Sequence, residues 1–164
     1  MFKLIGGIID RVFSLTGAVI FSQAPSFLQQ YQQQLTGRIE ELKWQVKVME
    51  ESASLTGKNL QEYINKFLIN DDLDFKHQGE MMKNSLDRLN SYLNQLNGLE
   101  LSTPFGKPFI FVQNHDWNII KSTWANFQFN VPITVEAALY GLFGMVIFYS
   151  IFSLFKSIVK PVFN

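Results

Sequence analysis

The stretch TVEAALYGLFGMVIFYSIFSLF, from Thr134 to Phe155, decides the class of this protein. Glu136 is its only charged residue and lies at the start of the helix that such a composition predicts. At about 1.5 Å per helical residue the stretch is about 33 Å long, which matches the hydrocarbon core of a bilayer. We therefore predict a transmembrane helix over residues 131–158, followed by a tail at 159–164.

A second apolar run lies near the beginning of the sequence, from Leu4 to Phe21, and Asp10 and Arg11 interrupt it. On a helical projection its small and polar residues fall on one side and its large apolar residues on the other. Such a stripe is typical of a contact between membrane helices, because glycine lets two backbones approach closely. We therefore predict a first transmembrane helix over residues 1–24. A helix lying flat in the membrane interface and a cleaved signal peptide are the alternatives.

The last span carries a matching stripe of small residues, so we expect the spans to pack on each other or on neighbouring copies. The predicted packing residues are Gly6, Gly7, Asp10, Ser14, Gly17, Ala137, Gly141 and Gly144. Asp10 allows two interpretations, because an ionisable residue inside a span is costly. Either it forms a neutralised pair with Arg11 near the interface, or a ring of Asp10 side chains lines an oligomeric pore.

Residues 25–130, between the two apolar runs, are polar and carry apolar residues at helical spacing. The pattern predicts helices at about 26–51, 59–70, 74–96 and 116–127, with breaks at 54–57, 70–72 and 98–108. In the two long helices the spacing approaches a heptad repeat, which is typical of coiled coils. The predicted seam consists of Leu35, Ile39, Leu42, Val46, Met82, Leu86, Leu89, Leu93 and Leu96. These seams either close on each other as an antiparallel hairpin or pair between subunits.

The predicted fold class is therefore all-α. We expect an integral membrane protein with N- and C-terminal transmembrane helices and an extramembrane, antiparallel coiled-coil-like helical bundle between them. The last helix of this bundle follows Asp116, the expected N-cap, whose carboxylate can accept hydrogen bonds from the first backbone N–H groups. Aromatic residues gather just before the second span, where interfacial belts occur. The predicted interfacial aromatics are Trp117, Trp124, Phe127 and Phe129.

Lysines at both ends of the sequence predict its orientation in the membrane. Lys3 precedes the first apolar run, and Lys156 and Lys160 follow the second. Because positively charged residues flanking spans stay on the cytoplasmic side, we expect both termini in the cytoplasm. The middle domain is then periplasmic, in the inner membrane of a bacterium.

Neither the composition nor the motifs indicate a catalytic, cofactor-binding or metal site. The chain has no cysteine, and its formal net charge of zero disfavours a nucleic-acid-binding protein. His77 and Glu80 are spaced as half of a carboxylate-bridged metal site, but the sequence lacks the second copy that such a site needs. We predict no catalytic, cofactor-binding or metal site, and no small-molecule substrate is identified. The expected partners are the lipid bilayer and either further copies of the chain or another membrane protein.

Two blocks of sequence resemble a known family. They are Gln23-Ala24-Pro25-x-Phe27, continuing as Gln30-Tyr31-x-Gln33-x-Leu35-x-Gly37, and Trp124-x-x-Phe127 through Val131-Pro132-Ile133-Thr134-x-Glu136. They resemble the N- and C-terminal signatures of a proteobacterial membrane family named domain of unknown function 2937. Phe129 and Ala137 depart from the family pattern, where Pro and Gly are frequent. The resemblance implies an inner-membrane protein of a proteobacterium and supplies no activity or catalytic residue.

These observations predict a non-enzymatic structural or interaction protein of the inner membrane. It would self-assemble or dock on a partner through its helical bundle and its small-residue membrane stripes. The alternative is a homo-oligomeric channel lined by Gly6, Asp10 and Ser14. In a channel this stripe would face a water-filled axis instead of the second span.

Overall fold

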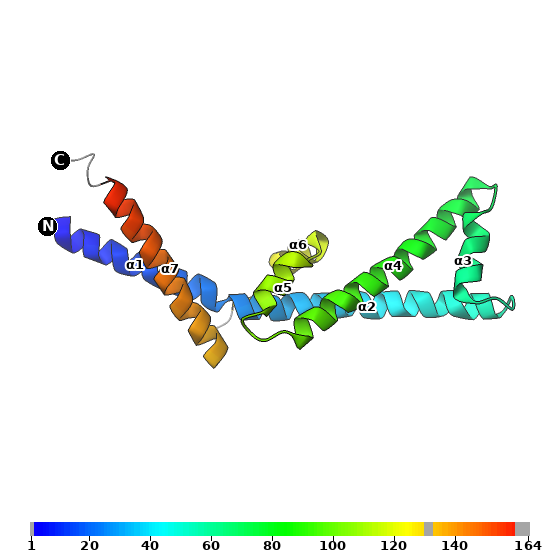
Figure 1. The fold of residues 1–164 in the computed structure, drawn as a ribbon, viewed down its shortest axis with the longest axis horizontal. Helices are drawn as coiled ribbons and strands as arrows, with labels where there is room; N and C mark the ends of the chain where they lie inside the picture. Colours follow the sequence, from blue (N-terminus) through cyan, green and yellow to red (C-terminus); the bar gives the residue numbers. More distant parts are fainter. Residues whose placement is uncertain (1, 130–132, 160–164) are drawn as a thin grey trace. The chain divides into compact units, whose positions relative to one another are not determined.

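The structure, a computed structural model, describes the backbone of residues 2–129 and 133–159 and the side chains of residues 11–129 and 133–155. Its helices are α1 (Phe2–Ser22), α2 (Ala24–Ser54), α3 (Leu60–Leu68), α4 (Leu73–Leu101), α5 (Lys107–Gln113), α6 (Trp117–Ala125) and α7 (Val135–Val159) (Figure 1). Within the described residues there is no strand, so the all-α prediction is confirmed.

Contacts divide the chain into two compact units. The first unit consists of the two ends of the chain, up to Gln30 and from Thr123 onward, and the second is Tyr31–Ser122. Residues 25–30 and 123–129, which we assigned to the extramembrane domain, thus group with the two apolar helices. The unit boundaries fall inside α2 and α6 instead of between helices.

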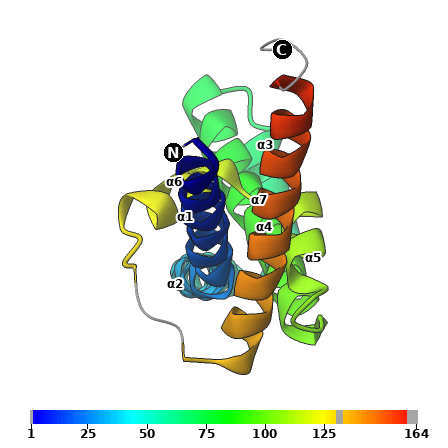
Figure 2. The ribbon, with the colours of Figure 1, turned by 90° about the vertical axis from the view of Figure 1, so that its left-hand side faces the viewer.

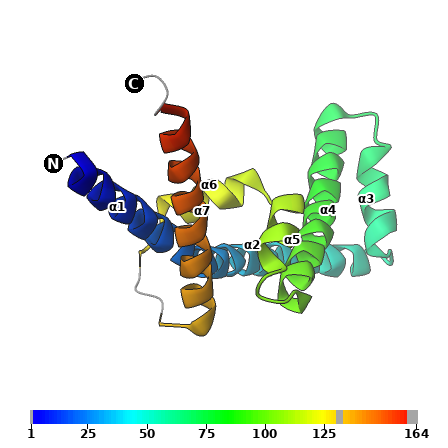
Figure 3. The same ribbon diagram turned by 60° about the vertical axis from the view of Figure 1, so that its left-hand side comes forward.

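The first unit is built on α1 and α7, which lie side by side (Figure 2). The helices run in opposite directions, so the beginning of α1 and the end of α7 lie at the same end of the pair (Figures 1 and 3). In the described part of the chain, Val135–Phe155 is the one segment whose length and composition mark it as a candidate membrane span, with a mean hydropathy of 1.9. α1 is helical where the first span was predicted. That span stays a prediction, because the first part of α1 lies outside the residues whose side chains are described.

The second unit has a single apolar core shared by α2, α4 and α6. Its buried members are Tyr31, Leu35, Ile39, Leu42, Val46, Leu89, Tyr92, Leu99 and Ile119, with Leu86, Leu93 and Leu96 partly buried against them. Most of the predicted seam therefore meets in one core, while Met82 is buried outside it. α4 runs back at an incline to α2 and separates from it toward α3 (Figures 1 and 3). The structure does not show the supercoiled pair that the heptad spacing predicted.

Glycines explain how α4 accommodates its neighbours. A Cβ added at Gly79 would lie 2.8 Å from the backbone nitrogen of Leu68, so the end of α3 packs directly on the α4 backbone. A Cβ at Gly98 would lie 3.3 Å from Ile110 of α5. We predicted a break from Gly98 to Pro108, which is wrong at both ends because α4 continues through Leu101 and α5 begins at Lys107. Gly98 is a packing position here and not a helix end.

Candidate functional site

α1 and α7 cross at three glycines, which we call the glycine crossing: Gly17, Gly141 and Gly144. A Cβ added at Gly144 would lie 2.5 Å from the carbonyl oxygen of Gly17. A Cβ added at Gly17 would lie 2.7 Å from the carbonyl oxygen of Gly144, and one at Gly141 would lie 3.4 Å from that of Ala18. The two backbones therefore touch at Gly17 and Gly144, where a larger residue has no space.

Phenylalanine rings flank the glycine crossing on both sides. Phe148 of α7 lies between Phe13 and Phe21 of α1, with ring centroids 5.2 and 6.2 Å apart. Phe13 also contacts Phe152 at 5.5 Å, and Phe21 contacts Phe143 at 6.3 Å. Each aromatic pair of this kind adds about 0.5–1.5 kcal/mol beyond the area it buries. Glycine contacts and ring contacts together fix the register of α1 on α7.

Where their side chains are described, the remaining faces of α1 and α7 are mostly apolar and exposed. On α1 the exposed large side chains include Val12, Leu15, Val19 and Ile20. On α7 they include Leu139, Leu142, Phe143, Val146, Tyr149, Ile151, Leu154 and Phe155. Soluble proteins rarely leave a contiguous apolar surface of this extent uncovered.

The structure places most of the predicted packing stripe. Ser14 shares a pocket of about 430 Å³ with Arg11 and Leu15 of α1 and with Met145 and Tyr149 of α7. Besides the three glycines of the crossing, the predicted stripe includes Ala137, which is buried. The predicted positions Gly6, Gly7 and Asp10 lie outside the residues whose side chains are described. The described part of the α1 stripe, Ser14 and Gly17, thus faces α7.

Where α2 begins, an aromatic junction connects its first turns to the end of α6 and to the residues that follow it. We define it as Phe27, Gln30, Trp124, Phe127, Gln128 and Phe129. Phe27 contacts Trp124 and Phe127 at centroid distances of 6.1 and 5.6 Å, and Phe127 contacts Phe129 at 5.0 Å. The side-chain amide of Gln30 donates to the backbone carbonyl of Gln128 at 3.2 Å and accepts from its N–H at 3.3 Å.

The aromatic junction brings together the two sequence blocks quoted above. Phe27 and Gln30 come from the first block, and Trp124 and Phe127 from the second. Of the predicted interfacial aromatics, Trp124 and Phe129 are largely exposed and Phe127 is partly buried. Trp117 lies in the second unit, where its ring packs edge-on against His115.

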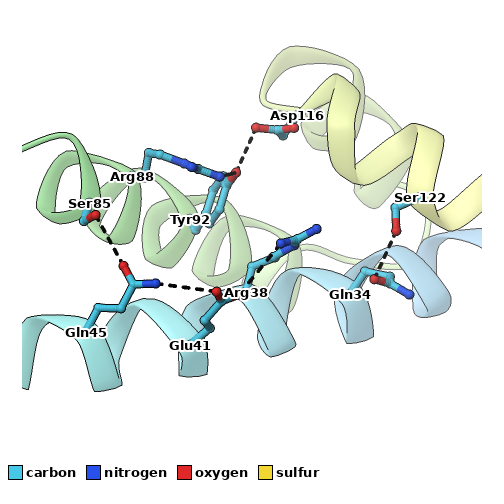
Figure 4. A network of polar contacts seen from close by, with 9 residues as sticks. All are labelled: Gln34, Arg38, Glu41, Gln45, Ser85, Arg88, Tyr92, Asp116 and Ser122. Carbon is cyan, nitrogen blue, oxygen red and sulfur yellow. Dashed lines mark hydrogen bonds and ion pairs between the residues drawn. The ribbon is translucent and has the colours of Figure 1, made fainter. Parts of the chain in front are cut away.

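The core of the second unit contains a hydrogen-bonded tyrosine network of Tyr31, Arg88, Tyr92, Gln95 and Asp116. The hydroxyl of Tyr31, a fully buried residue, donates to Oε1 of Gln95 at 2.9 Å and accepts from the backbone N–H of Asp116 at 3.0 Å. The Tyr92 hydroxyl donates to Oδ2 of Asp116 at 2.9 Å and accepts from Arg88 at 3.2 Å (Figure 4). The network therefore connects α2, α4 and the start of α6.

Asp116 is also the N-cap that the sequence predicted for α6. Its Oδ1 accepts hydrogen bonds from the backbone N–H groups of Asn118 at 2.7 Å and Ile119 at 3.2 Å. Burial by itself would raise the pKa of Asp116. Hydrogen bonds from Ile119, Tyr92 and Asn118, together with the charge of Arg88, outweigh it and lower the pKa below the usual value. The carboxylate is thus held in its charged form.

The same environment shifts the pKa values of Tyr31 and Arg88. Burial raises the pKa of Tyr31, partly opposed by its hydrogen bond from Asp116. The hydrogen bond to Tyr92 raises the pKa of Arg88, with help from the charges of Asp116 and Glu41 and against the effect of burial. Each hydroxyl both donates and accepts within the network. The arrangement joins helices and presents no activated nucleophile or base.

Further polar pairs border this core (Figure 4). Gln34 of α2 accepts from the hydroxyl of Ser122 at 3.4 Å, and Gln45 accepts from that of Ser85 at 3.4 Å. His77 and Glu80, considered above as half of a metal site, are an exposed pair 3.4 Å apart. Across the described residues, no group of three or more potential metal ligands lies together.

Sequence reasoning found Asp116 as a cap but missed the tyrosine network. Tyr31 is 64 positions from its partner Gln95 and 85 positions from its partner Asp116. No local sequence pattern marks a tyrosine whose hydroxyl forms hydrogen bonds across a core. The Gln30–Gln128 pair, 98 positions apart, was missed for the same reason.

Comparison with known proteins gives one match. The model of the DUF2937 family, described as a protein of unknown function, matches residues 5–164. No curated protein and no solved structure matches the chain.

Proposed function

The chain belongs to the DUF2937 family, and we propose that it is a non-enzymatic protein of a bacterial inner membrane. Two spans, α1 and α7, anchor the helical unit Tyr31–Ser122, which self-assembles or docks on a membrane-protein partner. The alternative of a homo-oligomeric pore is kept as an outcome of the tests below.

The apolar surface of the α1–α7 pair is the observation that carries this proposal. The two helices touch through backbone at the glycine crossing and expose large apolar side chains elsewhere, including Val19 at 61% and Leu142 at 58%. Membrane helices pack in this way. Lipid tails contact large apolar side chains as favourably as a second helix does, so helix pairs associate where small residues let the backbones approach closely. α7 contains the candidate span Val135–Phe155, and α1 shares its surroundings in this proposal because the two helices pack along each other.

Antiparallel packing supports the orientation proposed from the lysines. The beginning of α1 and the end of α7 lie at one end of the pair (Figure 2), and Lys3, Lys156 and Lys160 belong to those ends of the sequence. With positive charge retained inside, both termini are cytoplasmic and the helical unit is periplasmic.

The position of the α1 stripe favours packing over a pore. A pore requires Ser14 and its neighbours to face a water-filled axis formed between copies. Ser14 instead borders a pocket with Met145 and Tyr149, and Gly17 lies against Gly144. An interaction role therefore fits the described residues better than a channel does.

The native mass of the full-length protein, extracted in a mild detergent and in nanodiscs, tests the assembly proposal. We expect a discrete multimer of the same size in both preparations, measured by light scattering. A monodisperse monomer would refute self-assembly and a homomeric pore together, and would leave docking on a partner. Release of the protein from membranes by alkaline carbonate would contradict the membrane anchor itself.

The pore alternative has its own test in Asp10. Liposomes containing the protein would leak ions through a pore, and Asp10→Asn would change that leak. Equal ion flux with the wild type, with Asp10→Asn and with empty liposomes would exclude the pore.

A further inference from the structure

Helix α5 has an apolar surface on each of two sides. Ile110 and Phe111 pack against the core of the second unit. Phe109 and Val112 instead point outward and are 65% and 67% exposed. They are separated by three positions, so they are neighbours on one helix face. A short helix that is apolar on both sides has a second surface to cover.

Trp117, at the start of α6, extends this outer surface. Its indole packs edge-on against His115 with ring centroids 4.8 Å apart, and it is 65% exposed. Nδ1 of His115 lies 3.0 Å from the carbonyl oxygen of Val112, which joins the end of α5 to Trp117. We call Phe109, Val112 and Trp117 the α5 surface.

On the α2 side, a short stretch of chain connects the α5 surface to the proposed membrane anchor. The ring of Phe111 packs edge-on against Tyr31 at 4.9 Å, and the backbone N–H of Asp116 bonds the Tyr31 hydroxyl. Tyr31 follows Ala24, the first residue of α2, by about 10 Å of helix. Only Gln23 separates α2 from α1.

A second connection limits the distance on the other side. The chain passes from Ala125, the end of α6, to Val135, the start of α7. This stretch is about 34 Å long at most when fully extended. The two connections therefore limit how far the α5 surface can lie from the proposed anchor.

The composition of the α5 surface fits the boundary between headgroups and acyl chains. Tryptophan and phenylalanine are enriched there because an aromatic ring tolerates a partly polar, partly apolar environment. Lys121 follows Trp117 by four positions on α6 and is exposed, so the two side chains share a helix face. A lysine in that position can reach an anionic headgroup.

We propose that Phe109, Val112 and Trp117 insert into the interfacial layer of the bilayer that holds the chain's own spans. The helical unit is then fixed to the membrane surface by its side chains as well as by its covalent connections. This inference rests on the proposed membrane anchor, and the test below separates the two.

Single-cysteine labelling can test the insertion directly, because the chain contains no cysteine. A nitroxide label is attached at Phe109→Cys in the full-length protein in nanodiscs of phosphatidylethanolamine and phosphatidylglycerol. The matched control is Ile69→Cys, an exposed apolar residue at the α3–α4 turn, at the other end of the unit from α5 (Figures 1 and 3). Leu142→Cys on α7 is the reference for the lipid phase.

Power saturation of the electron spin resonance signal measures the exposure of each label to oxygen and to a water-soluble nickel complex. We expect the label at position 109 to be at least threefold more exposed to oxygen, relative to nickel, than the label at position 69. Equal exposure at the two positions would overturn the inference. Shielding of position 109 from both reagents would also overturn it, because a protein partner or second copy would then cover the surface. If position 142 is itself exposed to nickel, the proposed anchor fails.

Tryptophan fluorescence provides a second readout that leaves the α5 surface intact. The chain has three tryptophans, and replacing Trp44 and Trp124 with phenylalanine leaves Trp117 alone. We expect lipids brominated on their acyl chains to quench Trp117 more strongly than aqueous iodide does. Stronger quenching by iodide would overturn the inference.

Discussion

Asp116 combines three local roles in one side chain. One carboxylate oxygen caps α6, the other accepts from Tyr92, and the backbone N–H of the same residue bonds Tyr31. The sequence predicts the first role because capping depends on residues next to each other in the chain. The other two depend on contacts between helices, and a single sequence without contact information cannot place Tyr31 and Tyr92 on the same carboxylate.

Stability should depend on pH through Asp116. Because its folded-state pKa lies below its value in the unfolded chain, about 3.9, its contribution is present above about pH 4 and is lost as the pH falls through the folded value. Asp116→Asn keeps a good N-cap but removes the charge. We expect the variant to be about 1–2 kcal/mol less stable at neutral pH, with the difference shrinking below about pH 4.

The measurement is thermal unfolding of the detergent-solubilised protein, followed by circular dichroism between pH 3 and pH 7. Asp87→Asn, an exposed position on α4, is the matched control and should leave the unfolding temperature unchanged. A difference between wild type and Asp116→Asn that stays constant across this range would contradict the assigned role of the charge.

Tyr31→Phe should destabilise the helical unit without changing its core volume much. The change removes a fully buried hydroxyl and leaves the Asp116 N–H and the Gln95 amide oxygen without it. We expect a loss of about 1–3 kcal/mol in the free energy of unfolding, measured by urea titration in detergent. Tyr63→Phe on α3 is the comparison, and equal losses for both variants would show that the network contributes nothing specific.

At the scale of elements, the helices with a long apolar pattern were predicted correctly. The prediction failed at a glycine, because glycine occurs both at helix ends and at close helix contacts. α7 is recognised from an uninterrupted apolar stretch, and α2 from apolar residues at regular helical spacing over many turns. Gly98 was interpreted as a break because glycine weakens helices, yet it allows α5 to approach α4. α5 is too short for periodicity to reveal. The inclination of α4 to α2 depends on where α3 packs, at Gly79, which spacing alone does not encode.

Gly144→Ala should disrupt the α1–α7 pair. The added methyl group would overlap the Gly17 carbonyl and the Phe21 side chain, so the backbones must separate. We expect a loss of about 1–3 kcal/mol, as in overpacked cores. It would appear as a lower unfolding temperature in nanodiscs.

Gly37→Ala is the matched control for this substitution. No atom lies within 4 Å of a Cβ added at Gly37, which is exposed on α2. Alanine there should be neutral or stabilise the helix by up to about 1 kcal/mol. Similar behaviour of the two variants would mean that α1 and α7 do not cross at these glycines in the membrane.

At the scale of the whole molecule, the two ends of the sequence belong to one structural unit. The quoted sequence blocks resembled a family signature, and the aromatic junction supplies their physical connection: Phe27 packs on Trp124 and Phe127. Hydropathy predicted that the ends are apolar and helical. Hydropathy did not predict that residues 25–30 and 123–129 group with these ends. Those segments mix polar and aromatic residues, so they do not stand out as apolar.

Impermeant labelling should test the proposed orientation. Lys66→Cys places a thiol at an exposed position of α3, and Asn164→Cys places one at the end of the sequence. In intact spheroplasts we expect a membrane-impermeant maleimide to react at position 66 and to reach position 164 only after lysis. Labelling of both positions before lysis would contradict the two-span arrangement.

The two sides of the glycine crossing are synthesised at different times. Gly17 emerges from the ribosome long before Gly144, and at roughly 5–20 residues per second the interval is about 6–25 s. In the proposed two-span arrangement α1 is therefore without its partner for that time, and its small-residue face contacts lipid or an insertion factor. The helical unit can meanwhile close around Tyr31 and Asp116, so the spans meet only after the segment between them has been made.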